Sequence, residues 1–411
     1  MLSHEENKLL THTGPRTPMG QLMRRYWIPA VFSAQIAGPD SLPVRVQLLG
    51  ENLVAFRDTE GRVGLLDERC PHRTASLFFG RNEECGLRCV YHGWKFDVEG
   101  NCVDLPSEPP GSSFQDKIRV KAYPSIERAG LVWTYMGPSG LMPEFPELGW
   151  TLLPENQRLV SRHIQECNWL QGLEGGFHAS HIAFLHRGTG AVNQHVVPSF
   201  HETMRSDFGA IVGTGRESGE GDIRWGTALF IAPFQKVFAS NPNGAHIWVP
   251  MDDENTMLYS VDFYPAGPAD SALMKRSREY FHIHTENLPG TDHAIQNKGN
   301  DYLIDRAVQA GGQSYTGLKG LGVQDCAIQE SMGPIADRTI EHLGVSDQCI
   351  IQLRQLLLEA LNDHEQGKTP PGLDPKSYRA RSIRFHLPPG ESFEAAMREN
   401  LRNMLTPSAA E

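Results

Sequence analysis

The alternation of apolar and polar positions divides the chain into three regions. In residues 1–40, apolar residues recur at helical spacing after Thr17-Pro18, a plausible helix start, and Pro29 is expected to end that helix. Residues 41–145 carry short apolar runs of strand length between turn residues, among them VRVQLLG, NLVAFRD and RVGLLDE. We therefore predict a helical arm over residues 1–40, which packs with the C-terminal region, and a small all-β domain over residues 41–145.

Two hairpins are predicted inside the β domain. A Thr-Glu-Gly turn at residues 59–61 separates two of its apolar runs, and KAYPSIERAGLVWTYMG at residues 121–137 has the pattern of a second hairpin. The stretch 138–150 is rich in Pro and Gly, so we expect a linker there.

Residues 146–411 mix strand and helix patterns, which makes the whole chain α+β. The segments TALFIAPF, AHIWVPM and TMLYSVDFY are separated by gaps of hairpin length, which predicts an antiparallel sheet. A glycine-rich polar segment, 287–322, is predicted to be a mobile loop over a pocket. Helices are predicted over residues 166–186, 326–343, 346–364 and 391–405. In the third of these helices, Ser346 is the candidate N-cap, and an apolar stripe is formed by Ile350, Leu353, Leu357 and Leu361.

Composition narrows the class of protein. Lys and Arg number 38 against 49 Asp and Glu, a formal charge of −11, which argues against a general binder of nucleic acid or of anionic membranes. No apolar run approaches the roughly 18 residues of a membrane span, and the N-terminus MLSHEENKLL is not a secretory signal, so we expect a cytoplasmic protein. Seven cysteines, an odd number, favour metal binding or burial over a disulfide framework.

Two cysteine–histidine pairs lie in the predicted β domain, at Cys70-Pro-His72 and Cys89-Val-Tyr-His92. Two thiolates and two imidazoles suit either a tetrahedral zinc or an iron–sulfur centre. Zinc fingers usually pair Cys with Cys, whereas here each pair mixes the two residue types. Such a mixture suits a [2Fe–2S] cluster with both sulfurs on one iron and both imidazoles on the other. Cys85 and Cys102 lie outside the pattern and are expected to be buried thiols.

Three histidines fall within nine residues further along the chain. His178 and His181 are three residues apart and share a face on a regular helix. His181 and His186 are five apart, about 140° around a helix, so they can bind one metal only if the helix bends or ends between them. Helical spacing alone would therefore favour the first two as a metal-binding pair.

The motifs around these residues resemble one family. CPHRTASL and CVYHGWKFD closely resemble the Rieske pattern, and NWLQGLEGGFHASHIAFLH is similar to the mononuclear-iron motif of Rieske non-haem iron oxygenases. TGPRTPMGQLMRRYWIPA and ESMGPIADRTIEHLGVSD extend the resemblance over nearly the whole chain, towards the phthalate-dioxygenase-type branch. The resemblance implies that Cys70, His72, Cys89 and His92 bind a Rieske [2Fe–2S] cluster.

The same resemblance selects the ligands of the mononuclear iron. It implies that His181 and His186 bind Fe(II), together with a carboxylate far downstream. Asp325, in GVQDCAIQESMG, is the best match for this third ligand, and Asp337 and Glu330 are the alternatives. Two histidines and one carboxylate form the facial triad of Fe(II) oxygenases, which leaves positions open for dioxygen and water.

One position departs from the family pattern. The family has an aspartate where this chain has His178, and that carboxylate connects a cluster histidine of the neighbouring subunit to an iron-ligand histidine. His178 can hydrogen-bond at both nitrogens but brings no negative charge. It is either a working substitute, a change that impairs electron transfer, or an accidental or engineered one; the first is preferred. Asn168 matches an iron-proximal position of the motif, with an amide bonded to local backbone as the alternative.

The family implies a function and its partners. We expect a terminal oxygenase with an N-terminal Rieske domain and a catalytic domain over residues 146–411 of the helix-grip, START-like kind, assembled as a homotrimer or hexamer. It would use O2 and electrons from NADH, delivered by a flavin/[2Fe–2S] reductase, to hydroxylate or oxidatively O- or N-demethylate an aromatic substrate. The alternative is a degenerate, weakly active or uncoupled redox or ligand-binding homologue, because of His178.

Aromatic acids are the usual substrates of this branch, so a cation is expected near the substrate. The candidate cations are Arg205, Arg216 and Arg224, and the candidate pocket aromatics are Trp225, Phe230, Trp248 and Phe263.

Overall fold

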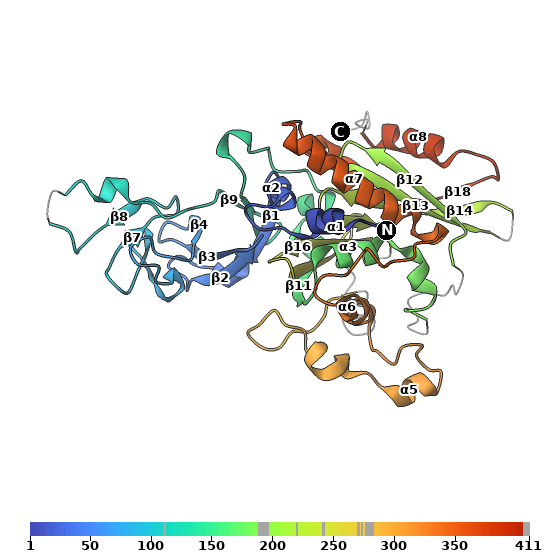
Figure 1. Cartoon of the computed structure of the whole chain (residues 1–411), viewed down its shortest axis with the longest axis horizontal. Coiled ribbons are helices and arrows are strands. Elements are labelled where there is room, and N and C mark those ends of the chain that lie inside the picture. The colour runs from blue at the N-terminus through green and yellow to red at the C-terminus, as the bar shows by residue number, and fades with distance from the viewer. Residues whose placement is uncertain are drawn as a thin grey trace. The chain divides into compact units, whose positions relative to one another are not determined.

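The computed structural model describes residues 1–109, 112–187, 197–218, 221–240, 243–268, 272, 274–275 and 283–405 (Figure 1). The chain forms two compact units. The smaller unit comprises Gly14–Arg16 and Met23–Pro143, and the larger unit comprises Met1–Thr13, Thr17–Leu22 and Glu144–Glu411.

The smaller unit is built from short antiparallel strands, in agreement with the strand patterns. One sheet has the order β1 (Trp27–Phe32), β10 (Leu131–Tyr135) and β9 (Ser125–Arg128). A second sheet consists of β2 (Val44–Leu48), β3 (Glu51–Arg57) and β4 (Val63–Asp67). The third consists of β5 (Arg81–Glu83), β6 (Gly86–Arg88), β7 (Lys95–Phe96) and β8 (Cys102–Asp104). Both predicted hairpins are confirmed, β3–β4 and β9–β10. The second turns at Ala129 and Gly130, which both have positive φ, as a two-residue type I′ turn requires.

The helix expected to end at Pro29 is wrong in its extent. Two helices precede that residue, α1 (His4–Thr11) and α2 (Pro18–Met23), and Pro29 lies inside strand β1. The β1–β10 pairing shifts register between Pro29 and Val31, and such a bulge accommodates a residue without a backbone N–H. Helix α1 starts with a capping box of Ser3 and Glu6, a sequence signal that identifies its first turn.

The larger unit contains one antiparallel sheet, as predicted. Its strands follow the order β11 (Arg158–Gln165), β17 (Thr256–Phe263), β16 (Asn243–Pro250), β15 (Gln235–Phe238), β14 (Ile223–Ile231), β13 (Gly209–Glu217) and β12 (Phe200–Ser206). Strand β18 (Arg384–Leu387) pairs with the first half of β14, and β15 pairs with its second half.

Besides α1 and most of α2, the described helices of the larger unit are α3 (Trp169–Phe177), α5 (Arg306–Ala310), α6 (Leu321–Ser331), α7 (Gln348–Glu365) and α8 (Phe393–Leu405). The helix predicted over 326–343 is wrong in its extent, because α6 begins earlier and ends before Gly333, which has φ 91°, and Pro334. The predicted loop 287–322 holds α5 and, over Lys298–Leu303, two short 3-10 turns that meet at a kink. None of the described helices combines the length and hydropathy that a membrane span requires.

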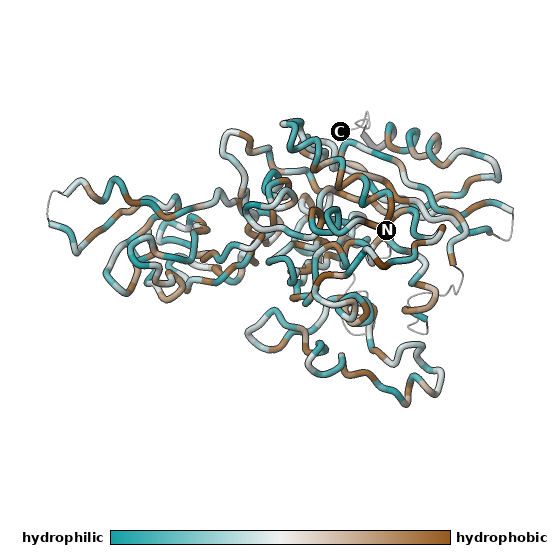
Figure 2. The backbone as a smooth tube through the Cα atoms, viewed as in Figure 1, coloured by the Kyte–Doolittle hydropathy of each residue, from teal (hydrophilic) through white to brown (hydrophobic). Residues whose placement is uncertain are grey.

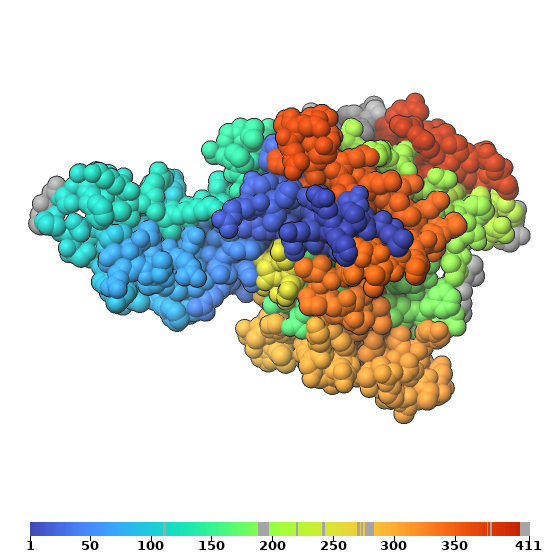
Figure 3. Space-filling view, viewed as in Figure 1, coloured from blue at the N-terminus to red at the C-terminus, as the bar shows by residue number. Residues whose placement is uncertain are grey.

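Helix α7 bears out its predicted apolar stripe. Hydrophobic and hydrophilic segments alternate along it in Figure 2, and Ile350, Leu353, Leu357 and Leu361 are buried. The helix packs against β12, β13 and α1, and Figure 3 shows α1 lying beside it. Its N-cap is Asp347 rather than Ser346, which lies in a preceding 3-10 turn.

Two glycines let α3 lie close to the sheet. A Cβ on Gly172 would lie 2.3 Å from Cδ1 of Trp248, and a Cβ on Gly176 would lie 2.5 Å from Cη2 of the same ring. Because these glycines are four residues apart, they share one face of α3. The Gly-x-x-x-Gly spacing of this segment therefore fixes how near the chain that follows α3 comes to the sheet.

Candidate functional site

Three metal-ligating side chains converge just after α3. The Nε2 atoms of His181 and His186 lie 3.2 Å apart, and Oδ1 of Asp325 lies 3.5 Å and 3.3 Å from them, respectively. Helix α3 ends at Phe177, and residues 179–183 form a 3-10 turn, so the chain is not a regular helix between the two histidines. The break brings together the pair that lies about 140° apart on an ideal helix. Asp325 comes from the middle of α6.

The outer nitrogens of both imidazoles are held by protein oxygens. Nδ1 of His181 contacts the carbonyl oxygen of His178, and Nδ1 of His186 lies 2.8 Å from Oε1 of Gln324. The Gln324 amide is itself fixed, because its Nε2 donates to Thr316 Oγ1 and to the Leu318 carbonyl oxygen. Such partners keep the proton on Nδ1 and leave the Nε2 lone pair for a metal. The donor set, two imidazoles and one carboxylate, fits mononuclear Fe(II).

Burial and charge set the protonation of this cluster. Burial lowers the pKa of His181 to about 4, so this imidazole is neutral at pH 7. Burial alone would lower the pKa of His186 and raise that of Asp325. The attraction between the two outweighs burial, so the pKa of His186 rises and the pKa of Asp325 falls. Asp325 is therefore an anion at neutral pH, as a metal ligand must be.

The alternatives to Asp325 have other partners. Asp337 is exposed and accepts hydrogen bonds from the backbone N–H and hydroxyl of Thr339. Glu330 accepts a hydrogen bond of 2.5 Å from the Tyr302 hydroxyl. Neither carboxylate belongs to the three-residue group.

Asn168 has a structural role in place of the iron-proximal one considered from the sequence. It caps α3, because its Oδ1 accepts from the Leu170 N–H at 3.1 Å. Its Nδ2 donates to the carbonyl oxygens of Thr11 and Asp253. The amide is buried, uses both donor positions and its acceptor on backbone, and does not line the cavity described below.

His178 lies at the junction between α3 and the 3-10 turn. Its Nε2 is 3.1 Å from Oδ1 of Asp347, the residue that caps α7. The His178 backbone is also tied to the metal-ligating group through the contact of its carbonyl oxygen with His181. His178 occupies the position at which the family has an aspartate, and the carboxylate of Asp347 lies next to its imidazole.

The two cysteine–histidine pairs meet in the smaller unit. Cys70 follows β4, and Cys89 and His92 lie in the turn between β6 and β7. The thiols are buried, 1% exposed for Cys70 and 2% for Cys89, whereas His72 is exposed and its ring lies 4.4 Å from that of His92. Burial and the neighbouring Cys89 raise the pKa of Cys70 to about 11.

Each of the two loops is tied back on itself by backbone hydrogen bonds. The Thr74 N–H donates to the Cys70 carbonyl oxygen, and the Gly93 N–H donates to that of Cys89. Gly93 has φ 79°, and a Cβ there would lie 2.7 Å from Pro106, so only glycine fits this turn.

The arrangement of donors fits a Rieske cluster. Two sulfurs lie inside and two imidazoles at the surface, so one iron would be covered and the other accessible to an electron-transfer partner. The Trp94 ring stacks on His72 at 4.4 Å and covers the site from the side of the core. Cys102 is buried, as predicted, but Cys85 is only half-buried.

A cavity of about 830 Å³ opens beside the His181–His186–Asp325 group. Its opposite wall is the sheet, because strands β13 to β17 all contribute lining residues. These residues alternate along β13, β15, β16 and β17, whereas residues 224–228 of β14 line the cavity consecutively. Trp225 and Trp248 line it, as expected for a pocket for an aromatic compound, whereas Phe230 packs against Phe177 and does not line it. Phe263 does not line it either.

Cations line the cavity, although one of them was not anticipated. Arg216 and Arg224 lie opposite each other on β13 and β14 and both reach the cavity, whereas Arg205 is exposed and paired with Glu359. Lys236 on β15 also lines the cavity, and its Nζ donates to the Gly176 carbonyl oxygen. No sequence pattern indicated Lys236, because a lone lysine in a strand is ordinarily a solvent-exposed residue.

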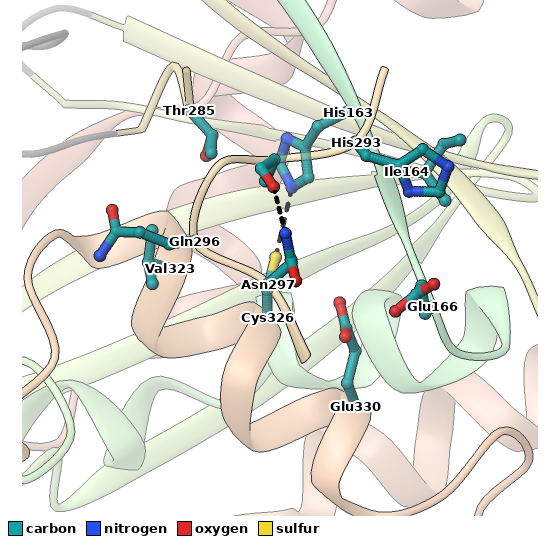
Figure 4. A pocket seen from close by; sticks show the side chains of 11 residues that line it. His163, Ile164, Glu166, Thr285, His293, Gln296, Asn297, Val323, Cys326 and Glu330 are labelled. Carbon is teal, nitrogen blue, oxygen red and sulfur yellow. Dashed lines mark hydrogen bonds between the residues drawn. The ribbon is translucent and has the colours of Figure 1, made fainter. Parts of the chain in front are cut away.

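A second, small pocket shares a wall with this cavity (Figure 4). His163 and Cys326 line both spaces, and the His163 Nε2 lies 3.3 Å from the Cys326 sulfur. Glu330 lies at the far side of this pocket in the figure, where burial raises its pKa. His163 and Cys326 therefore form the wall between the two spaces, next to Asp325.

Comparison with known proteins agrees with both centres. Residues 26–124 match the Rieske [2Fe-2S] domain, and residues 220–385 match the family described as LigXa C-terminal domain like. The oxygenase subunit of 3-chlorobenzoate-3,4-dioxygenase from Comamonas testosteroni is 38% identical, over 98% of this chain and 99% of that protein. The oxygenase subunit of phthalate 4,5-dioxygenase from Pseudomonas putida is 36% identical, over 94% and 92%.

Solved structures share the fold. A mutant of NdmA from Pseudomonas putida CBB5 with caffeine superposes with a TM-score of 0.64, at 20% identity, over 92% of this chain and all of that one. The expected α+β fold, with a Rieske domain before a catalytic domain, is thereby confirmed. The chain belongs to the oxygenase subunits of Rieske non-haem iron oxygenases, oxidoreductases that carry a [2Fe–2S] cluster and a mononuclear iron.

Proposed function

We propose that this chain is the terminal oxygenase of a multicomponent system that hydroxylates or oxidatively demethylates an aromatic carboxylate. The observation that carries the proposal is the convergence of His181, His186 and Asp325 on the wall of a large cavity with aromatic and cationic lining. The two relatives named above, whose substrates are 3-chlorobenzoate and phthalate, support an aromatic acid as the substrate class.

The proposal assigns one centre to each unit. The smaller unit would hold the cluster through Cys70, His72, Cys89 and His92, and the larger unit would hold iron through His181, His186 and Asp325. Residues 23–40 then belong with the cluster domain rather than with a helical arm. When bound, the two groups supply the electrons and the centre at which dioxygen is reduced.

The chain's own residues bind and orient the substrate. Lys236 lies beside the iron-ligating group, and burial lowers its pKa to about 8, so most of it remains a cation at pH 7. It has no carboxylate partner within ion-pair distance in the part of the chain that the structure describes; its neighbours are the Gly176 carbonyl oxygen and the rings of Phe177 and Phe238. A substrate carboxylate at Lys236 would supply the missing anion and place the ring next to Asp325.

His178 takes the place of the family's bridging aspartate in this proposal. Its imidazole can hydrogen-bond at both nitrogens, and the Asp347 carboxylate lies 3.1 Å from its Nε2. In this proposal the imidazole links the cluster of one subunit to the iron of the next. The partner would be a flavin and [2Fe–2S] reductase that uses NADH, and the assembly a homotrimer or a stack of two. Because NADH is a cytoplasmic metabolite, we place the system in the cytoplasm.

The test is turnover with an electron source and labelled dioxygen. The purified holoenzyme, with a flavin/[2Fe–2S] reductase and NADH, is offered benzoates, their methyl ethers and the matching neutral benzamides under ¹⁸O2. We expect label in the product or loss of a methyl group with acids, and little turnover of the amides. Lys236→Met should remove the preference for acids by about tenfold or more.

Two outcomes would contradict the proposal. Equal turnover of acids and amides would exclude an aromatic carboxylate as the substrate class. Oxygen uptake that yields only peroxide with every compound would favour the degenerate, uncoupled alternative.

A further inference from the structure

A row of polar side chains crosses the sheet face that lines the cavity. In the strand register, Lys236 on β15 lies opposite His246 on β16, His246 lies opposite Ser260 on β17, and Ser260 lies opposite Ser161 on β11. Directly opposed residues of antiparallel strands point to the same face, with Cβ atoms about 5 Å apart. We call these four residues the polar row; Lys236, His246 and Ser260 line the cavity, and Ser161 continues the row beyond them.

The far end of the row carries a carboxylate. Asp262 follows Ser260 by two positions on β17, so it points to the same face, and both line the cavity. Its register partner on β16 is Gly244, and the ring of Phe238 lies over that glycine. The Asp262 carboxylate lines the cavity although it is buried from bulk water, 3% exposed.

A buried histidine lies beside this carboxylate. His284 Nε2 lies 3.2 Å from Asp262 Oδ2, within ion-pair distance but without hydrogen-bond geometry, and His284 Nδ1 lies 2.6 Å from the Ser161 hydroxyl. Ser161 therefore holds the His284 ring next to Asp262, and His284 itself does not line the cavity. A carboxylate has two oxygens and about four lone-pair directions, so it can accept a further hydrogen bond while it contacts His284.

His246 lies between the two charged ends. Its ring packs against the edges of Phe238 and Trp248, with ring centroids 5.4 Å and 5.5 Å away. Its ring nitrogens have no hydrogen-bond partner within the described residues, and it lines the cavity. Burial lowers its pKa to about 4, so the ring is neutral and offers one donor and one acceptor.

We propose that Asp262, with His246 beside it, forms a second anchor that takes a hydroxyl or amino substituent of the aromatic acid. The assignment follows from charge: an anion fits Lys236, whereas Asp262 repels a second anion and only accepts hydrogen bonds. The inference rests on the proposed function and adds that the substrate is a hydroxy- or amino-substituted aromatic carboxylate. The site therefore selects a hydrogen-bond donor at one end of the ring and an anion at the other.

The test measures binding to the holoenzyme, without turnover. Dissociation constants are determined by calorimetry under anaerobic conditions for benzoate and for its 3- and 4-substituted hydroxy, amino and methyl derivatives. Methyl is close in size to hydroxyl and amino but cannot donate. We expect at least one hydroxy or amino acid to bind about tenfold or more tightly than its methyl counterpart.

Variants assign the preference to the anchor. Asp262→Asn should reduce the hydroxy-over-methyl ratio to near one, whereas Asp363→Asn, which changes an exposed carboxylate on α7, should leave it as in the wild type. Ser161→Ala, which removes a partner of His284, should reduce the ratio partly. It provides a second measurement if the first variant does not fold.

Each outcome has one meaning. If acids bind without a hydroxy-over-methyl preference, or if the preference survives Asp262→Asn, the second anchor is wrong and the proposed function stands. If no benzoate binds at all, the aromatic-acid substrate class itself fails, which the comparison of acids with amides detects separately.

Discussion

Single side chains decide whether the iron site can form. Gln324 is one of them, because its Oε1 accepts from His186 and its Nε2 is held by Thr316 and Leu318. No sequence pattern identified it, since a glutamine one residue before the carboxylate ligand carries no signal of its own. The fold makes it the residue that keeps His186 in the tautomer that can bind metal.

We predict that Gln324→Leu weakens iron binding by about 10- to 100-fold while the cluster stays intact. The substitution removes the acceptor for Nδ1–H of His186 and frees the ring to rotate. Iron affinity is measured by titration of chelated protein, and the cluster by its visible absorption. Gln366→Leu, in the exposed residue that follows α7, is the control. Unchanged affinity in the Gln324 variant would show that the ring is oriented by the cavity wall alone.

His178 is the residue at which this chain departs from its family. We predict that His178→Ala slows product formation by about tenfold or more with both metal centres retained, because the imidazole proposed to link the two centres is lost. His178→Asp, the family residue, should restore the rate. Single-turnover product formation from the reduced protein is the measurement. If neither variant changes the rate, His178 is not on the electron path.

At the scale of elements, a buried ion network fixes the helices around the site. Glu174 on α3 accepts from Arg338, after α6, and from Arg354 on α7, and Arg354 also pairs with Glu341. Arg338 is 0% exposed. The network ties the segment that ends at His178 to the helix that begins after Asp347, so it holds two of the elements that position the site.

We predict that Glu174→Gln destabilises the larger unit by about 3–5 kcal/mol, because the buried Arg338 loses its carboxylate partner and Arg354 keeps only Glu341. Burial raises the pKa of Glu174, but Arg338 and Arg354 outweigh it, so the folded-state pKa lies below the ordinary value of 4.5. This stabilisation is complete above about pH 4.5 and is lost as the pH falls through the lower folded-state pKa. Thermal unfolding from pH 7 to pH 3 measures it.

The glutamine variant supplies its own control for the pH effect. Its unfolding temperature should be lower at pH 7 and should fall less steeply below pH 4.5 than that of the wild type. Parallel pH curves for the two proteins would mean that other carboxylates cause the acid destabilisation.

At the scale of the whole molecule, the proposed homotrimer makes a test of complementation possible. His72→Ala should lack the cluster and Asp325→Ala should lack the iron, so each is inactive alone. If electrons cross between subunits of a ring, mixed trimers regain activity, because a site works when an intact cluster faces an intact iron. Random mixing of equal amounts gives about a quarter of the wild-type rate per site, measured after co-expression.

No recovery in mixed trimers would contradict transfer between subunits. An equal mixture of the two variants purified separately, without subunit exchange, is the control and should remain inactive.

The sequence by itself determined the elements and the ligand candidates. Hairpin turns such as Ala129-Gly130 are encoded locally, and so is the α7 stripe, because φ preference and periodicity are properties of neighbouring residues. The cysteine–histidine pairs were recognisable because each pair consists of residues that are close together in the sequence. Boundaries failed where a distant partner decides them, as at Trp27–Phe32, which becomes a strand because it pairs with β10.

Only the tertiary structure decided which side chains meet. It separated Asp325 from Asp337 and Glu330, and it assigned the Asn168 amide to the cap of α3. It also placed Lys236, His246 and Asp262 on one cavity face, although each is an isolated polar residue in its strand. The physical reason is that strand register and the packing of α6 against α3 set these distances, and both depend on contacts between residues far apart in the chain.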